Sequence, residues 1–240
     1  MRKILKRIFP DQLRQAYRAY RLTRPQADRE CPICGFTGPF GMFGVPPRID
    51  AECPSCHSLE RHRQFMLWLD SDQTRQIDRD IPVLHFAPEN LLEAKLRERF
   101  SNYRTADLFA PADLKLDLEN LDLPDGSVGM AIANHVFEHV DDRKACAEIM
   151  RVLQPGGRLV ASVPMVDGWA ETYENPHITS EEDRLLHFGQ KDHLRYFGAD
   201  FTDRVQGSGL TLIEEFTAAG SDVIRYGLRR GEKLFVFQKR

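Results

Sequence analysis

The chain has 240 residues, a formal net charge of −3 and a hydrophobic content of 42%. These values are typical of a soluble globular protein, with room for one sizeable core and a small additional module. No apolar run approaches the ~18 to 20 residues that cross a bilayer, and the basic N-terminus lacks the apolar core of a signal peptide. We therefore expect no transmembrane segment, a cytoplasmic location and reduced cysteines.

Charge is distributed unevenly along the chain. Residues 1–28 contain eight Lys or Arg and two Asp, about +6, so the remainder carries about −9. Within this segment DQLRQAYRAYRL has helical spacing, with Leu13, Tyr17, Tyr20 and Leu22 roughly on one side. The pattern predicts a basic N-terminal helix within 1–28. Either it is a solvated helix docked on the domain, or it meets RNA, anionic lipid or an acidic partner.

Four cysteines precede the main domain in two pairs. Cys31 and Cys34 form one C-x2-C turn, and Cys53 and Cys56 form a second one after an 18-residue spacer. Two such turns supply the four thiolates of a structural zinc site, and four thiolates leave no position open for a substrate. The Gly- and Pro-rich spacer offers little core, so the metal would supply much of the folding energy. Disulfide pairing is the alternative, which a reducing compartment disfavours.

The zinc ribbon is expected to continue into a helix. SLERHRQFMLWLD has helical character with Ser58 as its N-cap, so the ribbon and its helix are assigned to 29–70. The polar stretch 71–80 is the expected domain boundary. Cys146 stands alone in a later helical run and is interpreted as a small buried hydrophobe.

From residue 81 the sequence alternates between strands and helices. Strands are expected at IPVLHF, NYRTAD, LKLDL, VGMAIANHV, RLVASVP, LTLIEEF and KLFVFQK. Helices are expected at PENLLEAKLRERF, opened by Pro88, at DDRKACAEIMRVL, capped by Asp141 or Asp142 and stopped by QPGG, and at GADFTDRVQGSG. Such alternation predicts a parallel sheet covered on both faces, with ligands at the carboxyl ends of its strands. The last two strands follow without a helix, so one is expected to be antiparallel.

One long segment resembles a known family. DLENLDLPDGSVGMAIANHVFEHVDDRKACAEIMRVLQPGGRLVASVP is similar to the core of class I S-adenosylmethionine-dependent methyltransferases, and DHLRYFGADFTDRVQGSGL resembles the segment leading into the family's last helix. The resemblance covers about 81–240 and is closest to a subgroup with HFAPE as its first motif and a preceding cysteine ribbon. It implies a Rossmann-like, doubly wound α/β domain over 78–240. It further implies seven strands with an antiparallel last strand, and S-adenosylmethionine as cofactor.

The first strand ends in VLHFAPEN, where dinucleotide-binding proteins carry a glycine-rich loop. A carboxylate at Glu89 would repel a pyrophosphate, which disfavours NAD and ATP, whereas S-adenosylmethionine carries a cationic ammonium and sulfonium. Glu89, or His85 through water, can face the methionine end. Ala87 permits close approach of the backbone, and Phe86 completes the motif. The alternative for Glu89 is simply a favourable charge at a helix N-terminus.

Further cofactor residues follow the later strands. Asp107 ends the second strand, about 20 residues after the tip of the first, where an acidic side chain accepts from both ribose hydroxyls. A solvated turn aspartate is the alternative. Asp117 and Leu118 match the pair that frames adenine in the resembling family, and Asn134 and His135 are expected to face the methyl group.

The segment 165–197 is too long for a simple connection and is predicted to be a lid that forms an acceptor pocket. It combines aromatic side chains with titratable ones, listed here: Trp169, Tyr173, Phe188, His177, His187, Asp192 and His193. A surface excursion and a second metal site are the alternatives. His193 is the favoured catalytic base because DHLRYF resembles the family segment that returns to the active site, with His135 second. Glu138 and His139 are interpreted as local hydrogen-bond partners.

The predicted function is methyl transfer from S-adenosylmethionine to a small molecule or saccharide. One alternative is an RNA methyltransferase that uses the zinc ribbon and the basic N-terminus to bind nucleic acid. Against it, the rest of the chain is acidic, and NHVF stands where enzymes that methylate base amines carry Asn-Pro-Pro-aromatic. The other alternative is a non-catalytic module that keeps the fold without the cofactor.

Overall fold

The computed structural model describes residues 11–25 and 27–240, which form two compact units. The smaller unit contains the described residues up to Leu67 together with Ala218–Arg230, and the larger contains Trp68–Thr217 and Gly231–Arg240. The division falls inside helix α3 (Glu60–Leu69) and not in the polar stretch 71–80. The contribution of Ala218–Arg230 to the smaller unit has no counterpart in the sequence prediction.

The predicted N-terminal helix is present as α2 (Asp11–Thr23). Residues 1–10 and 26 of the expected segment lie outside the described residues. No residue of α2 is buried, and Leu13, Tyr17, Tyr20 and Leu22 are 55%, 62%, 61% and 64% exposed. The helix is therefore solvated along its length, and its apolar side chains do not contribute to a core.

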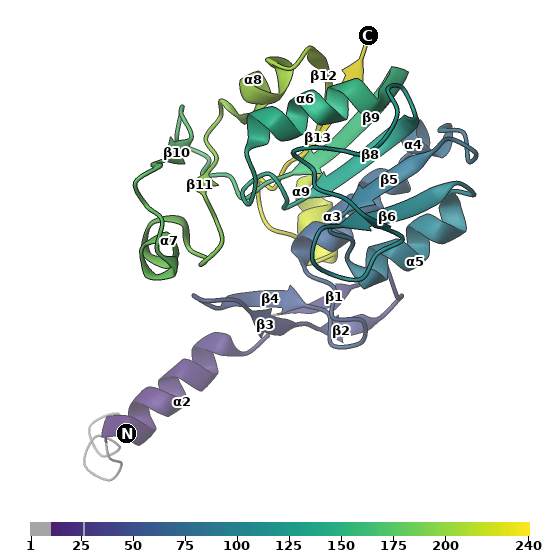
Figure 1. Ribbon diagram of the computed structural model, residues 1–240. Helices are drawn as coiled ribbons and strands as arrows, with labels where there is room; N and C mark the ends of the chain where they lie inside the picture. Colours follow the sequence, from purple (N-terminus) through teal and green to yellow (C-terminus); the bar gives the residue numbers. More distant parts are fainter. Residues whose placement is uncertain (1–10, 26) are drawn as a thin grey trace. The chain divides into compact units, whose positions relative to one another are not determined.

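The smaller unit is built from short antiparallel strand pairs (Figure 1). β1 (Asp28–Glu30) pairs with β2 (Thr37–Pro39), and β3 (Gly41–Phe43) pairs with β4 (Arg48–Glu52). The helices of this unit are α2, most of α3 and the short α9 (Gly220–Arg225). Among the described residues, the apolar cluster around the cysteines contains the buried Cys31, Phe40 and Cys53, with the partly buried Ile33, Phe36 and Cys56 packed against them. Three of these six side chains are the thiols themselves, so few other apolar groups surround the cysteines.

A fully buried arginine, Arg63, joins the parts of the smaller unit. Its guanidinium donates to the carbonyl oxygens of Ala51 (2.9 Å), Tyr226 (2.7 Å) and Gly227 (2.6 Å), and also to that of Ser58. These carbonyls come from β4, from the turn before α3 and from the segment after α9. One buried cation thus satisfies backbone acceptors that are far apart in the sequence.

The larger unit contains a seven-stranded sheet in the order β12-β13-β9-β8-β5-β6-β7 (Figure 1). The strands are β5 (Val83–Phe86), β6 (Tyr103–Asp107), β7 (Leu114–Lys115), β8 (Val128–Asn134), β9 (Leu153–Ser162), β12 (Leu210–Phe216) and β13 (Leu234–Lys239). β13 is antiparallel to both of its neighbours, and the other pairings are parallel. The predicted doubly wound α/β sheet with an antiparallel last strand is confirmed.

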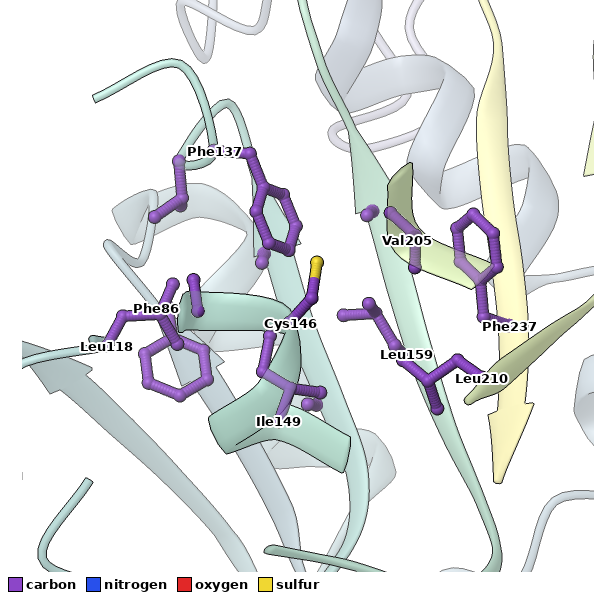
Figure 2. Packing of buried hydrophobic residues seen from close by; sticks show 14 of the residues in the cluster. Phe86, Leu118, Phe137, Cys146, Ile149, Leu159, Val205, Leu210 and Phe237 are labelled. Atoms are coloured by element: carbon purple, nitrogen blue, oxygen red, sulfur yellow. The ribbon is translucent and has the colours of Figure 1, made fainter. Parts of the chain in front are cut away.

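Helices cover both faces of this sheet. α6 (Asp142–Val152) and α8 (Phe201–Gln206) pack on one face, where their apolar side chains join those of the strands in one core cluster (Figure 2). Cys146 lies within that cluster, as predicted, and burial raises the pKa of its thiol to about 12. α5 (Asn90–Arg99) packs on the other face, where the Arg97 guanidinium lies 5.1 Å from the centre of the Tyr103 ring. The short helix α4 (Asp72–Arg75) precedes the sheet in the chain.

The predicted helix caps and turns differ in part from those in the structure. Pro88 precedes the N-cap of α5, which is Glu89, so it does not open the helix. Asp141 caps α6 by accepting from the backbone of Arg143 and Lys144, as expected. The QPGG turn lies within β9 and not at the end of α6. The expectation that no helix separates the last two strands is wrong, because α9 lies between β12 and β13.

The segment 165–197 is a folded insert. Its described elements are β10 (Tyr173–Glu174), α7 (Glu181–Phe188) and β11 (Arg195–Tyr196), and β10 pairs antiparallel with β11. Its two ends meet where Met165 forms a bridge with Phe197. At Gly198 a Cβ would lie 2.5 Å from the carbonyl oxygen of Glu171, so only glycine fits this close approach. The insert is therefore closed at its base.

Two arginines and two carboxylates join the insert to the rest of the larger unit. Arg204 of α8 forms two bonds to Asp142, of 2.6 and 2.9 Å, and also contacts Glu174. Arg195 donates to Glu174 at 2.8 Å. Burial alone would raise the pKa of Glu174, but hydrogen bonds from Arg204 and Arg195 lower it below its usual value. This network joins α6 and α8 to β10 and β11.

In the part of the chain that the structure describes, no helix has both the length and the apolar character needed to cross a membrane.

We expect Asp142→Ala to lower the free energy of unfolding by about 3 to 5 kcal/mol, because it leaves two nearly buried guanidinium groups without their shared carboxylate. The control is Glu215→Ala, which removes a surface partner of Lys233 and should cost less than about 1 kcal/mol. Urea unfolding measures both variants. Equal costs would show that the network does not stabilise the domain.

Candidate functional site

The carboxyl ends of the central strands meet at one edge of the sheet. In the paired register Phe86 is opposite Ala106 on one side and Ala133 on the other. The residues that follow this row, Ala87, Asp107 and Asn134, therefore lie at the same edge. The strand order reverses between β5 and β8, and such a switch point is where open α/β sheets bind ligands. The structure thus brings together the predicted residues that end these strands.

Two residues at this edge have unusual backbone conformations. Ala87 follows β5 with φ of 45°, and His135 follows β8 with φ of 54°. Residues other than glycine adopt positive φ at a cost of roughly 1 to 2 kcal/mol, and such positions concentrate at functional sites. The loop without glycine therefore keeps the backbone turn that a glycine would favour.

The side chains of the HFAPE motif point in different directions. His85 is fully buried, with its Nδ1 2.8 Å from the Tyr103 hydroxyl, and its Nε2 lies 3.7 Å from Glu89 Oε2. Phe86 belongs to the core on the α6 side of the sheet (Figure 2). Because His85 is fully buried, it does not present its side chain to solvent at this edge. Glu89 occupies the N-cap position of α5 without a side-chain capping bond.

Asp107 ends β6 and is half-buried. Its Oδ1 accepts from the backbone N–H groups of Phe109 and Ala110, both at 2.7 Å. Because Oδ1 makes both bonds, Oδ2 is the oxygen left to accept from ligand hydroxyls. The sequence offered two roles for Asp107, a ligand of the ribose hydroxyls and a turn aspartate. The two are compatible, because Oδ1 fixes the turn and leaves Oδ2 free for a ligand.

The other predicted cofactor residues differ in exposure. Asp117 is exposed, and its Oδ1 accepts from Glu119 N at 2.9 Å. Leu118 is 5% exposed and packs in the main core, so of this pair only Asp117 presents its side chain to solvent. Asn134 is buried, and its Oδ1 accepts from the Ser162 hydroxyl at 3.1 Å.

A cluster of titratable side chains lies just beyond the end of β8. Glu138, His139 and His193 bring one ligand atom each within 4.8 Å of one another. Burial lowers the pKa of His193, which favours its neutral imidazole. Sequence reasoning treated Glu138 and His139 only as local partners. The signal that could have identified them is the adjacent Glu-His pair after a strand end, together with a second histidine in a segment expected to return to the site.

The four predicted metal ligands form a second cluster, in the smaller unit. The sulfur of Cys31 lies 3.6 Å from that of Cys56, and the sulfur of Cys34 lies 3.7 Å from that of Cys53. A disulfide would require about 2.05 Å. Tetrahedral zinc with bonds of about 2.3 Å separates its sulfurs by roughly 3.8 Å, so these side chains fit a zinc ion.

The turns that carry the cysteines are alike. Cys31 N donates to Phe36 O and Gly35 N to Cys31 O, and Cys53 N and His57 N repeat this pattern in the second turn. Gly35 and His57 both have positive φ. Burial raises the pKa of the Cys53 thiol to about 12, so this sulfur needs a nearby cation to ionise.

A cavity of about 220 Å³ lies away from this chemistry. It is lined by residues that include Val83 and Val128, the first residues of β5 and β8. These are the amino ends of the strands, opposite to the edge that carries Asp107 and Asn134. We therefore do not assign a ligand site to it.

Comparison with known proteins supports the assignment of the larger unit. A family model described as a methyltransferase domain matches residues 74–161. The solved structure of an S-adenosylmethionine-dependent methyltransferase from Mesorhizobium loti is similar with a TM-score of 0.51 at 14% identity, over 70% of this chain and 95% of that one. The larger unit has the class I methyltransferase fold. A geranyl diphosphate methyltransferase solved with GPP and sinefungin has a TM-score of 0.52 at 14% identity, over 78% of this chain and 80% of that one.

A curated relative matches part of the chain. The malonyl-[acyl-carrier protein] O-methyltransferase of Alcanivorax borkumensis is 30% identical over 107 residues, which are 42% of this chain and 36% of that protein. The match thus spans about a third of the relative's length. It does not extend to the whole of either protein.

We expect Ala87→Gly in the larger unit to leave the free energy of unfolding unchanged or to raise it by up to about 1 kcal/mol. Relief of the positive φ, roughly 1 to 2 kcal/mol, offsets the entropy that glycine loses on folding. The control Ala94→Gly, at an exposed position inside α5, should cost about 0.5 to 1 kcal/mol. If thermal unfolding shows the same loss for both variants, Ala87 is not strained.

Proposed function

We propose that the protein transfers a methyl group from S-adenosylmethionine to an acceptor. The observation that carries this proposal is the sheet edge where Ala87, Asp107 and Asn134 follow adjacent strands in one register. The match of 74–161 to a methyltransferase domain and the similarity to a malonyl-[acyl-carrier protein] O-methyltransferase support it.

The cofactor would lie across this edge. Asp107 would accept from the ribose hydroxyls through Oδ2, and Asp117 would accept from the adenine amino group. Glu89 would face the cationic methionine end, where its charge is favourable and a phosphate would be repelled. His85 would act through Glu89. The small side chain of Ala87 would let the cofactor approach the backbone closely. Phe86 would not obstruct this approach, because its ring is held in the core.

Catalysis would rest mainly on alignment of the acceptor with the sulfonium methyl, which can supply about 7 to 11 kcal/mol in favourable intramolecular cases. If the acceptor loses a proton, His193 is the base we assign, with His135 second. Trp169 and Tyr173, which are 42% and 36% exposed, offer aromatic surface for the acceptor. Phe188 is buried and packs against Tyr173, so it helps to hold the Tyr173 ring in place.

We assign the acceptor to small molecules or saccharides, and the protein to the cytoplasm. An RNA acceptor is the second candidate, because α2 is solvated and carries Arg14, Arg18 and Arg21 beside its exposed apolar side chains. Binding that weakens steeply with salt would favour RNA. A module without cofactor binding is the remaining alternative, which the titration below tests.

We further propose that Cys31, Cys34, Cys53 and Cys56 hold one structural zinc ion. Four thiolates and zinc together carry a charge of −2, and Arg63 lies close to this charge through Ser58, whose hydroxyl is 3.4 Å from Arg63 Nη1 and 3.3 Å from Cys31 Sγ. The buried cation would thus offset the charge of the metal site. Ser58 therefore serves the cysteine cluster, whereas the sequence predicts it as a helix cap.

Elemental analysis should find one zinc per chain, and Cys53→Ser or a strong chelator should release it and unfold the smaller unit. Cys146→Ala is the control, because it removes a buried thiol from the methyltransferase core and should leave the zinc content unchanged. A zinc-free protein with the ribbon intact by hydrogen exchange would contradict the assignment.

Asp107→Ala should weaken binding of S-adenosylmethionine about ten- to more than a hundred-fold, because it removes hydrogen bonds to a charged acceptor worth ~1.5 to 3 kcal/mol. Asp107→Asn can keep the turn bonds to Phe109 and Ala110 and should lose less. The control is Asp125→Ala, which removes an exposed carboxylate that pairs with Arg151, before the amino end of β8.

Isothermal titration calorimetry measures these affinities. An unchanged affinity in Asp107→Ala would show that the ribose binds elsewhere. No binding by the wild-type protein would refute the proposed cofactor and leave the non-catalytic module.

A further inference from the structure

The cluster of Glu138, His139 and His193 has properties that methyl transfer does not require. Glu138 is 1% exposed and His193 is 3% exposed, and both lie within 4.8 Å of a His139 ligand atom. The His139 side chain is 32% exposed, so the cluster opens toward solvent on that side. A carboxylate and two imidazoles together are a common ligand set for transition metals.

The orientation of both histidines is fixed through the same ring atom. His193 Nδ1 lies 3.2 Å from the carbonyl oxygen of Phe188, and His139 Nδ1 lies 3.2 Å from Asp192 Oδ2. Metal-bound histidines are held in this way by a carbonyl or carboxylate, which selects the tautomer and directs the other nitrogen at the ion. In both rings Nε2 is therefore the nitrogen left to bind.

The carboxylate of Glu138 is short of hydrogen bonds. Among the described residues neither of its buried oxygens has a hydrogen-bond partner, although His135 Nδ1 lies 3.2 Å from Oε1, within ion-pair distance. His135 Nε2 is likewise buried without a hydrogen bond from the described chain. A buried carboxylate without donors is costly, and a bound cation would offset that cost.

The backbone around the cluster is held firmly. Leu194 N donates to Glu138 O at 2.8 Å, and Arg195 Nη1 donates to Phe137 O and Val140 O at 2.8 and 2.6 Å. The rings of His139 and His193 meet edge to face with their centres 4.7 Å apart. The ligand-bearing segments are thus fixed to each other before anything binds.

We propose that Glu138, His139 and His193 bind a divalent transition-metal ion, such as zinc, iron or nickel, distinct from the ion held by the cysteines. Tetrahedral ligand atoms at about 2.0 to 2.1 Å from zinc are roughly 3.4 Å apart. The ligand atoms of the three residues now lie within 4.8 Å of one another, so binding requires a small rotation of the side chains that brings these atoms closer together. Three protein ligands leave at least one position open, unlike the four thiolates of the ribbon.

The open position lies beyond the end of β8, where the acceptor would meet the methyl group. There the ion can bind an oxygen donor of the acceptor and favour its deprotonated form, a role that rests on the proposed function. With the ion bound, His193 is a ligand and no longer the base assigned above, so the proton that the acceptor loses passes to His135, the second base.

The test is a titration with Ni²⁺ by calorimetry of the full chain prepared with one zinc ion per chain, with the zinc content measured before and after. We expect one Ni²⁺ to bind while one zinc is retained. Glu138→Gln should weaken this binding by more than the ~10- to 100-fold expected for Asp192→Asn, which removes only the partner of His139. The control His177→Ala changes an exposed histidine of the insert and should bind as the wild type does.

Thermal unfolding of the protein without Ni²⁺ separates a metal ligand from a structural carboxylate. Glu138→Gln should raise the unfolding midpoint, because it removes a buried charge, whereas a carboxylate that stabilises the fold through His135 would lower it. A lower midpoint, wild-type Ni²⁺ binding by Glu138→Gln, or Ni²⁺ binding only with loss of zinc would each overturn the inference.

The same preparations are titrated with S-adenosylmethionine. Cofactor binding without a second metal overturns this inference alone, and metal binding without the cofactor overturns the proposed function alone.

Discussion

The guanidinium of Arg195 holds the loop after β8 and the insert 165–197 together. Its Nη1 bonds to the carbonyls of Phe137 and Val140, which bracket Glu138 and His139, and its Nε bonds to Glu174 in the insert. Arg195 also stands two residues after His193 in the chain. A single buried cation thus fixes the loop after β8, the insert and the histidine that returns to the loop. Only a planar, multiply donating group can satisfy acceptors in three directions.

Such a cation needs compensation, which the neighbouring charges supply. Asp142 lies 3.6 Å from Arg195 and forms two shorter bonds to Arg204, and Glu174 contacts both arginines. Buried ion pairs add little net stability over apolar packing, but removal of one member is costly. The main effect of the network is therefore to fix the position of the insert against α6 and α8, and not to add net stability. The insert carries Trp169, Tyr173 and His193, so in the proposed function its placement would decide which acceptor the site can bind.

At the sheet edge, residues other than glycine adopt a backbone conformation that is typical of glycine. Ala87 adopts the positive φ that glycine would adopt freely, and His135 does the same at the adjacent strand. The strain is tolerated because the flanking strands pair on both sides of each position. Glu89 follows this turn as the N-cap of α5, where in the proposed function its charge would favour a cationic ligand. This combination agrees with a cofactor that has no phosphate.

Local patterns in the sequence predicted the seven strands of the large sheet, helices α2, α3, α5, α6 and α8, and the grouping of the four cysteines, because hydrophobic period and C-x2-C spacing act over a few residues. They also indicated Asp107 and Asn134, since strand ends in a parallel sheet share one edge. Only the tertiary structure decided that Ala218–Arg230 joins the ribbon through Arg63 and that Glu138 and His139 meet His193. Those contacts join residues more than 50 positions apart. Their formation depends on buried cations that satisfy backbone carbonyls from separate segments, and no short-range pattern encodes which carbonyls will meet.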